Sequence, residues 1–203
     1  MADDAGMQGV EIVMADPDRH AAAVADIYRP SVLASLATFE EVPPDAAEVA
    51  ARIRAVLART PWLVAIDRES GDVVGYAYAS PHQQRAGYRW SVNVSVYVAA
   101  TAQRRGIGRA LYQRLLDLLR RQRFVNAYAG VALPNPASEA LHAAIGMERI
   151  GVYRAVGYKH GGWVDVAWYG MRLRVPDDPP AEPIPLHELE LDTPGLAADE
   201  RGR

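Results

Sequence analysis

Apolar positions along the chain repeat with two periods, and each period predicts a different kind of element. Runs rich in β-branched and aromatic residues are typical of strands, whereas apolar residues three or four positions apart are typical of one helix face. The turn-forming run at 69–72 predicts a hairpin between the second and third strands. The predicted strands are Val10–Met14, Trp62–Asp67, Val73–Ser80, Tyr88–Val98, Asn126–Leu133, Arg149–Val156 and Val164–Arg174.

Four helices are predicted between these strands, and local signals mark their ends. The Asp-Pro pair at 16–17 and the Asn-Pro pair at 135–136 each give a capping residue followed by proline at the first helical position. Pro30 is expected to end the first helix and Gly146 to stop the last one. The predicted helical segments are 17–30, 45–57, 104–123 and 135–145.

The order of these elements predicts the fold class. Three consecutive strands followed by alternating helices and strands indicate an α/β (α+β) protein, with a mixed sheet and helices on its faces. The length of 203 residues, with 50% hydrophobic and 23% charged residues, predicts a single globular domain. We place this domain at 10–175, after a flexible leader at 1–9.

The segment 176–203 is a Pro-rich, acidic C-terminal tail that holds six of the 14 prolines. Its apolar surface is too small to offset the entropy cost of an independent fold. We expect this tail to lie along the domain or to stay mobile.

Charge and cysteine content exclude several classes of function. The net charge of −3 argues against nucleic acid as a partner, because such affinity depends mostly on phosphate neutralisation. The absence of cysteine excludes disulfides, zinc–thiolate sites and a cysteine nucleophile, and it fits a reducing, cytoplasmic location. No apolar run reaches about 18 residues, so no membrane span is expected. The five histidines lack metal-ligand spacing, so no metal is expected.

The segment Val94–Arg109, VSVYVAATAQRRGIGR, carries the strongest candidate chemistry. A predicted strand passes through a short loop into a glycine-containing helix start, where the first N–H groups lack partners within the helix. Together with the helix dipole they form an anion site suited to a pyrophosphate. The alternative is an ordinary helix N-terminus with a solvated basic surface. The pattern is neither a dinucleotide-binding GxGxxG nor a P-loop.

The run Q-R-R-G-I-G at 103–108, after a strand that ends in V-Y-V, resembles the acetyl-CoA motif of the GNAT acetyltransferase superfamily. Further similarities point to the branch of phosphinothricin and methionine sulfoximine N-acetyltransferases. They lie at Tyr28, Thr38, Phe39, 61–65, 75–79, Pro81, Arg85, Tyr88, Trp90, Ser95–Val98, 133–135, His142 and Gly157–Val166. The resemblance spans roughly residues 10–175. It implies the GNAT acyl-CoA N-acyltransferase fold, with a strongly twisted mixed sheet whose fourth and fifth strands splay apart to admit the cofactor.

The resemblance also implies how acetyl-CoA, the co-substrate, is held. The backbone of three residues would bond the pantetheine arm, namely Val96, Tyr97 and Val98. The pyrophosphate would be bound, mainly by main-chain N–H groups, at Arg104, Arg105, Gly106, Ile107, Gly108 and Arg109. Asn135 would contact the cofactor as well, although Asn is equally among the best helix N-caps, and one side chain cannot serve both roles at once.

Two residues are expected to carry the proton chemistry, His142 and Asn93. A lone helical histidine is usually structural, but the resembling branch carries a histidine at position 142, and imidazole titrates near neutrality. The branch commonly has a glutamate base in T-x-E-x-S-V-Y-V, where this chain reads S-V-N-V-S-V-Y-V with Asn93. Because asparagine is no base, either a bound water with His142 accepts the amine proton, or the acceptor differs. His20, His82 and His187 are expected at the surface. His160 belongs to the run Gly157–Val166, the late branch motif.

Acceptor recognition is expected on the segment 82–90 and around the middle of the neighbouring strand. The arginine at 85 suits a carboxylate or phosphinate, and the aromatic residues suit pocket walls, though core packing is the commoner fate of aromatics. The predicted acceptor-binding residues are Phe39, Arg85, Tyr88, Asn93, Val94 and Ser95.

These features together predict an N-acetyltransferase that moves acetyl from acetyl-CoA to the α-amine of a small amino-acid-like acceptor. Without a cysteine, the amine is expected to attack the thioester directly, with the Val98 N–H stabilising the oxyanion. The resemblance implies a homodimer, in which the Gly- and aromatic-rich run Tyr158–Val166 serves the interface. The alternatives are a catalytically silent acyl-CoA-binding sensor and, far behind, a nucleic-acid binder that uses the arginines of 104–123.

Overall fold

The computed structural model describes residues 9–189, so nearly all of the predicted leader and the end of the predicted tail lie outside the described residues. The strands are β1 (Val10–Met14), β2 (Trp62–Asp67), β3 (Val73–Pro81), β4 (Ser91–Val98), β5 (Asn126–Ala132), β6 (Glu148–Lys159) and β7 (Gly162–Arg172). The helices are α1 (Pro17–Ala34), α2 (Ala46–Leu57), α3 (Ile107–Arg121) and α4 (Pro136–Ala144). Short 3₁₀ turns are η1 (Ala86–Tyr88), η2 (Ala100–Ala102) and η3 (Leu186–Glu188).

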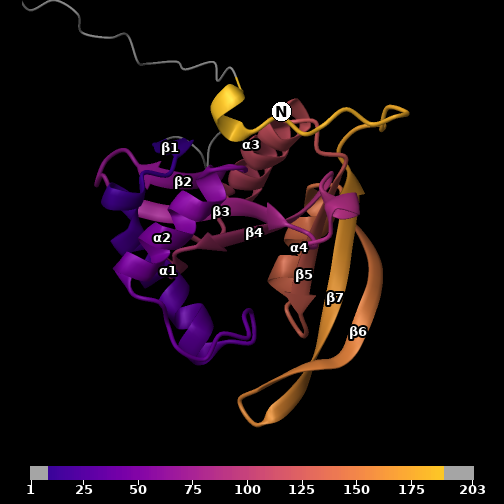
Figure 1. Ribbon diagram of the computed structural model, residues 1–203. Helices are drawn as coiled ribbons and strands as arrows, with labels where there is room; N and C mark the ends of the chain where they lie inside the picture. The colour runs from indigo at the N-terminus through magenta and orange to yellow at the C-terminus, as the bar shows by residue number, and fades with distance from the viewer. Residues whose placement is uncertain (1–8, 190–203) are drawn as a thin grey trace, which may run out of the picture.

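One seven-stranded sheet, in the order β1-β2-β3-β4-β5-β7-β6, organises the described chain. Its neighbours are antiparallel except for β4 and β5, which run parallel. This parallel pairing begins at Ser91↔Asn126 and ends at Asn93↔Tyr128, after which the two strands separate. Figure 1 shows β5, β6 and β7 diverging from the half of the sheet that contains β1–β4. The predicted mixed and splayed sheet is therefore confirmed.

The two faces of the sheet are covered by different helices, and each face has its own core. On one face, α1 and α2 bury Val24 and Ile53 against Trp62 and Tyr76 of the sheet. On the other face, α3 packs through a stripe that includes Leu111, together with alternate residues of β2–β5. Figure 1 shows α1 and α2 in front of the first strands and α3 behind them. The alternation of side chains along β4 therefore decides which face each residue serves.

Helix α1 continues past Pro30, where the sequence predicts its end. Proline removes one helical hydrogen bond and disfavours the interior of a helix. In the structure, Tyr28 and Val32, one turn apart, are both buried against the sheet, and the helix ends only at its C-cap residue Ser35. The prediction is wrong here because burial of the last apolar turn outweighs the local cost of the proline.

The two element boundaries next to the glycine-containing loop also differ from the prediction. Residues 88–90 belong to η1 and a turn, and β4 begins at Ser91. Helix α3 begins at Ile107, because Arg104 and Gly106 have φ angles of 63° and 79°, which are left-handed and not helical. The loop is therefore longer than expected, and it stands at the end of β4.

Strands β6 and β7 form a hairpin longer than predicted. Lys159 pairs with Gly162, so the connecting loop has two residues, His160 and Gly161, with φ angles of 51° and 80°. Two positive φ angles in a two-residue loop match the right-handed twist of the flanking strands. The late branch motif is thus the tip of a hairpin, which Figure 1 shows extending beyond the helices.

The first part of the predicted tail lies along the domain. The N–H of Ile184 donates to the Gln122 carbonyl at 2.8 Å, and the Gln122 side-chain amide donates back to the Ile184 carbonyl at 2.9 Å. Leu186 is buried, and the Trp90 indole N–H donates to the Ala181 carbonyl at 2.8 Å. Within residues 9–189, no helix is both long and apolar enough to cross a membrane.

Candidate active site

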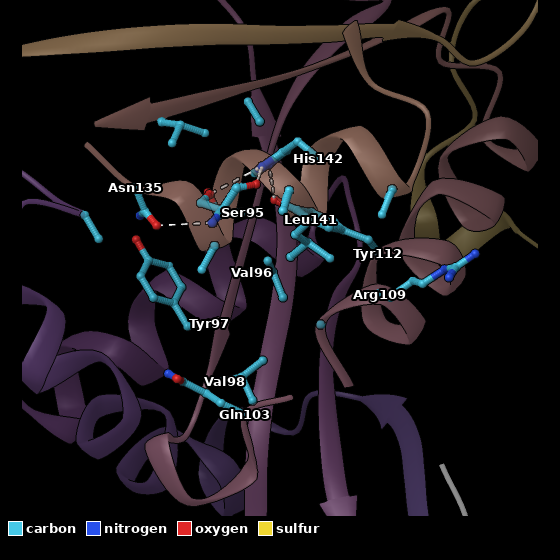
Figure 2. A pocket seen from close by; sticks show the side chains of 18 of the residues that line it. Ser95, Val96, Tyr97, Val98, Gln103, Arg109, Tyr112, Asn135, Leu141 and His142 are labelled. Carbon is cyan, nitrogen blue, oxygen red and sulfur yellow. Dashed lines mark hydrogen bonds between the residues drawn. The ribbon is translucent and has the colours of Figure 1, made fainter. Parts of the chain in front are cut away.

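A cavity of about 530 Å³ opens where β4 and β5 separate, and Figure 2 shows the side chains around it. Its walls come from Val94–Val98 of β4, Ala129–Ala132 of β5, the loop and first turns of α3, and α4. Ala37, from the segment between α1 and α2, lines it too. Because the lining includes residues from both faces of the sheet, the cavity passes through the sheet at the separation.

The open edge of β4 offers backbone groups to this cavity. Val96, Tyr97 and Val98 pair with β3 on one side, whereas no strand within residues 9–189 pairs with them on the other. The N–H of Ala99 donates to the carbonyl of Val74 in β3, and successive N–H groups of a strand point to opposite sides. The N–H of Val98 therefore points into the separation, as an oxyanion donor or a partner for an amide of the ligand would.

Two glycines shape the start of α3. Gly106 is the N-cap, and a Cβ there would meet nothing within 4 Å, so its positive φ is what favours glycine. A Cβ on Gly108 would lie 3.3 Å from Cδ2 of Leu141 and 3.6 Å from Cγ2 of Val98, so the missing side chain lets three elements meet. The helix start is thus open toward the cavity and has no side-chain cap, which fits an anionic group such as a pyrophosphate.

The structure brings most of the predicted cofactor-binding residues together and leaves one out. Arg104, Gly106, Ile107, Gly108 and Arg109 all line the cavity. Arg105 does not, because its guanidinium donates to Asp67 Oδ2 at 3.3 Å, beside the turn between β2 and β3. Neighbouring residues in such a loop point in different directions, and the sequence motif alone does not indicate which of them face the cavity.

Asn135 lies at the cavity and caps α4 at the same time. Its Oδ1 accepts from the Ser138 N–H at 3.1 Å, as expected of an N-cap. The amide Nδ2 of Asn135 is a donor that this cap does not use. The side chain therefore serves the helix with one atom and retains the other for a ligand.

His142 is buried in the cavity wall, with a partner at each ring nitrogen. Its Nδ1 lies 2.7 Å from the Ser138 carbonyl, which can only accept, so Nδ1 carries the hydrogen. Its Nε2 then accepts from the Tyr112 hydroxyl at 3.1 Å. The ring also stacks on Tyr169, with centroids 5.4 Å apart. Figure 2 shows His142 and Tyr112 directed toward one another from α4 and α3.

Burial sets the protonation of this pair. Removal from water lowers the pKa of His142, although its hydrogen bond to the Ser138 backbone acts in the opposite direction. Burial also raises the pKa of Tyr112. The imidazole is therefore neutral and the phenol is protonated at neutral pH, which makes Tyr112 a proton donor backed by His142.

Asn93 stands apart from the cavity lining, whereas Val94 and Ser95 after it belong to the lining. The Oδ1 of Asn93 is 2.8 Å from Nδ1 of His82. His82 was expected at the surface, but it is half-buried, and His20 is buried. The prediction was wrong for these two histidines because His20 lies on the buried face of α1, and the rings of Tyr88, Tyr128 and Trp168 lie around His82.

Phe39, Arg85 and Tyr88 do not line the main cavity. Arg85 and Tyr88 border a separate small hollow of about 60 Å³ beside the start of β4. Phe39 packs against the β6–β7 hairpin, where a Cβ on Gly157 would lie 2.2 Å from Cε1 of its ring. Next to it, the buried Lys159 ammonium donates to the Thr38 carbonyl at 2.7 Å. The hairpin tip is thereby tied to the segment between α1 and α2.

The sequence reasoning missed Tyr112 and Leu141 among the cavity residues. Tyr112 follows Gly108 by four residues, so it lies on the same helix face as the glycine predicted to meet the ligand. That spacing was a usable signal. Leu141 lies in α4 directly before His142, and its apolar side chain gave no sign of a binding role.

Comparisons with known proteins agree with this geometry. The family model of the acetyltransferase (GNAT) domain matches residues 19–168. The phosphinothricin N-acetyltransferase of Streptomyces viridochromogenes is 39% identical over 164 residues, which are 80% of this chain and 88% of that protein. An L-methionine sulfoximine/L-methionine sulfone acetyltransferase of Salmonella typhimurium is 32% identical over 154 residues, 75% of this chain and 88% of that one.

A solved structure shares the arrangement. The phosphinothricin acetyltransferase of Sinorhizobium meliloti, in complex with acetyl-CoA, superposes with a TM-score of 0.76 at 37% identity, covering 81% of this chain and 88% of that chain. The family match over most of the domain, the splayed sheet and the glycine-shaped helix start lead to one conclusion: the chain belongs to the GNAT family of acetyltransferases.

Proposed function

We propose that this protein transfers the acetyl group of acetyl-CoA to the α-amine of a small amino-acid-like acceptor of the phosphinothricin or methionine sulfoximine type. The observation that carries the proposal is the cavity between β4 and β5, which passes through the sheet. Such a passage lets a thioester on one side meet an amine from the other. The names of the relatives supply the acceptor class.

In this proposal, the donor lies along the open edge of β4 and ends at the start of α3. The backbones of Val96 and Val98 bond the pantetheine arm, and the turn at Gly106–Gly108 receives the pyrophosphate. Arg104 and Arg109 add positive charge at its rim. The Asn135 amide donates to the ligand while its oxygen caps α4.

The chemistry follows from the groups at the separation. The amine attacks the thioester carbonyl directly, and the Val98 N–H stabilises the oxyanion. When the C–S bond breaks, the Tyr112 hydroxyl passes its proton from the hydrogen bond with His142 to the thiolate, and the proton that the amine nitrogen then loses restores the phenol. His142 thus acts as a positioning residue, through the tyrosine that it orients.

The acceptor approaches from the face that carries Asn93 and Ser95. Val94 and Ser95 form the rim of the passage, and Phe39 with Tyr88 supplies aromatic walls farther out. Arg85 offers a guanidinium on an exposed turn, suited to a carboxylate or phosphinate that reaches beyond the passage.

We also propose that the protein is a cytoplasmic homodimer. The β6–β7 hairpin exposes several apolar side chains on one extended element, which supports a contact with a second copy. They are Ile150, Tyr153, Val156, Tyr158 and Trp163. Light scattering should give a mass of twice the 22.2 kDa of the chain, and a constant 22.2 kDa across dilution would contradict the dimer.

The decisive experiment has two stages. A thermal shift with acetyl-CoA tests donor binding, and release of free CoA thiol then tests transfer to phosphinothricin, methionine sulfoximine and other amino acids. Thiol release that depends on the amine supports the enzyme. Donor binding without release by any amine would favour a silent acyl-CoA sensor.

A further inference from the structure

The side chain of His82 is held in a defined position, close to where β4 and β5 separate. It directly follows β3, and four groups face its ring from four elements. The Oδ1 of Asn93, from β4, lies 2.8 Å from Nδ1. Tyr128 of β5 lies with its ring centroid 4.5 Å away, and Trp168 of β7 and Tyr88 of η1 each lie at 6.1 Å. A ring held from four sides is oriented, unlike a free surface histidine.

The hydrogen bond to Asn93 selects the tautomer of this ring. A side-chain amide oxygen can only accept, so Nδ1 of His82 carries the hydrogen. In the neutral imidazole, Nε2 then carries the lone pair. Tyrosine and tryptophan side chains are uncharged near neutral pH, so the groups that face the ring add no charge there. The result is an imidazole presented with its basic nitrogen away from Asn93.

The ring lies beside the last residue pair before the passage, and it is not itself part of the cavity lining. Asn93 and Tyr128, which both contact it, form the last residue pair before β4 and β5 separate. The next two residues of β4, Val94 and Ser95, line the cavity. Side chains alternate along a strand, so Asn93 shares its face with Ser95 and Tyr97, opposite to Val94. His82 is therefore on the side from which the proposed acceptor approaches.

The two residues that the sequence predicted to carry the proton chemistry offer no free proton acceptor to the amine. Asn93 has no titrating group, and both ring nitrogens of His142 already have partners. We infer that His82 is the catalytic base that accepts the proton of the acceptor ammonium, and that Asn93 is the residue that positions it. This inference rests on the proposed acetyl transfer and adds the proton acceptor to it.

The proton balance of the step is complete without a further reactant. The ammonium nitrogen passes one proton to Nε2 of His82, which becomes imidazolium, and the freed lone pair attacks the thioester carbonyl carbon. As the C–S bond breaks, the CoA thiolate takes the hydroxyl proton of Tyr112, and the second N–H proton of the tetrahedral adduct replaces it on the phenol. His82 then releases its proton to water. One acetyl amide, one CoA thiol and one net proton result from each ammonium and acetyl-CoA.

The test compares His82→Asn with His187→Asn, which makes the same change at an exposed histidine of η3. Asparagine at position 82 keeps a donor for Asn93 but has no basic nitrogen. With acetyl-CoA and methionine sulfoximine or phosphinothricin, we expect kcat at pH 7 to fall at least on the order of 10²-fold, with the KM for acetyl-CoA unchanged. The His187→Asn control should match the wild type.

The pH dependence separates a base from a structural role. As the pH rises toward the pKa of the acceptor amine, solvent supplies free amine, so the deficit of His82→Asn should shrink. Damage to the fold would give a deficit that does not recover with pH. A wild-type kcat in His82→Asn at pH 7, or a deficit constant from pH 7 to 9.5, would overturn the inference.

Asn93→Leu tests the positioning role. It should lower kcat less than His82→Asn does, and the double variant should be no slower than His82→Asn alone, because the two residues act as a unit. Strictly additive losses would contradict the pairing. If the wild type binds acetyl-CoA but releases no thiol with either acceptor, the proposed function fails and this inference fails with it. If the wild type is active and the His82→Asn variant is equally active, only this inference fails.

Discussion

At the scale of single residues, buried histidines make the stability of this protein depend on pH. His142 and His20 are both buried, and desolvation is the main cause that lowers the pKa of each below its usual value. Each also has its Nδ1 committed, to the Ser138 carbonyl and to the Asp16 N–H respectively. His20 accepts at Nδ1 and His142 donates there, so the two rings are held as opposite tautomers.

These pKa shifts predict acid destabilisation with a defined sign. Below about pH 6.5 the histidines of the unfolded chain gain protons that the folded chain resists binding, so stability falls as the pH drops. The unfolding midpoint of the wild type should therefore decrease between pH 7 and 5, before most carboxylates titrate. His142→Gln should flatten part of this slope, and His187→Gln should leave it unchanged. An identical slope in His142→Gln would show that His142 is not the cause.

At the scale of elements, the loop that joins β4 to α3 determines how an anion is received. Gly106 and Gly71 form a matched pair, since their φ angles are 79° and 77° and a Cβ at either would meet nothing within 4 Å. Gly106 is at the cavity, whereas Gly71 lies in the turn between β2 and β3. Substitution at either position therefore carries a similar backbone strain.

Gly106→Asp should weaken acetyl-CoA binding tenfold or more, about 1.4 kcal/mol, because it puts negative charge where the pyrophosphate is proposed to bind. Gly71→Asp should lower the free energy of unfolding about as much as Gly106→Asp does, because the backbone strain is similar. It should leave the affinity for acetyl-CoA unchanged. Calorimetry on both folded variants measures the difference. Equal affinities would rule out the assignment of this loop to the pyrophosphate.

How much of the molecule the sequence could predict depends on the range of the interactions involved. Strands β1 and β2 have the predicted bounds because their apolar runs and flanking turns are local. The continuation of α1 through Pro30 could not be predicted, since it depends on the burial of Val32 against the sheet.

The candidate site shows the same division. Gly106 and Gly108 were found because the motif is contiguous. The partnership of His82 with Asn93 was missed because it joins residues 11 positions apart, and only the β3–β4 register, in which Ser80 opposes Asn93, brings them together. No single-residue property of His82 distinguishes it from a surface histidine.

At the scale of the whole molecule, residues beyond the last strand help to hold the domain. Gln122 is fully buried, and its amide donates to the carbonyls of Arg59 and Ile184, so it joins the end of α3, the end of α2 and the C-terminal segment. Leu186, two residues after Ile184, is buried as well. This segment is therefore part of the packed structure, although its proline content resembles that of a linker.

Leu186→Ala should lower the free energy of unfolding by about 2 kcal/mol, because it removes a buried side chain. Glu182→Gln, which breaks the exposed ion pair with Arg89, should change it by less than about 0.5 kcal/mol. Denaturant titration of both variants checks the contrast. A negligible effect of Leu186→Ala would mean that the segment leaves the domain in solution.

In the described part of the chain, β4 and β5 pair through only three residue pairs, and this short pairing joins the two halves of the sheet. A pantetheine arm along the open edge of β4 would act as a surrogate strand, so the donor would complete the sheet as well as supply the acetyl group. Ligands that bind only the folded state stabilise it in proportion to the logarithm of their concentration. The temperature at which the protein unfolds should then rise with the concentration of acetyl-CoA, because the bound pantetheine arm would bridge the two halves of the sheet.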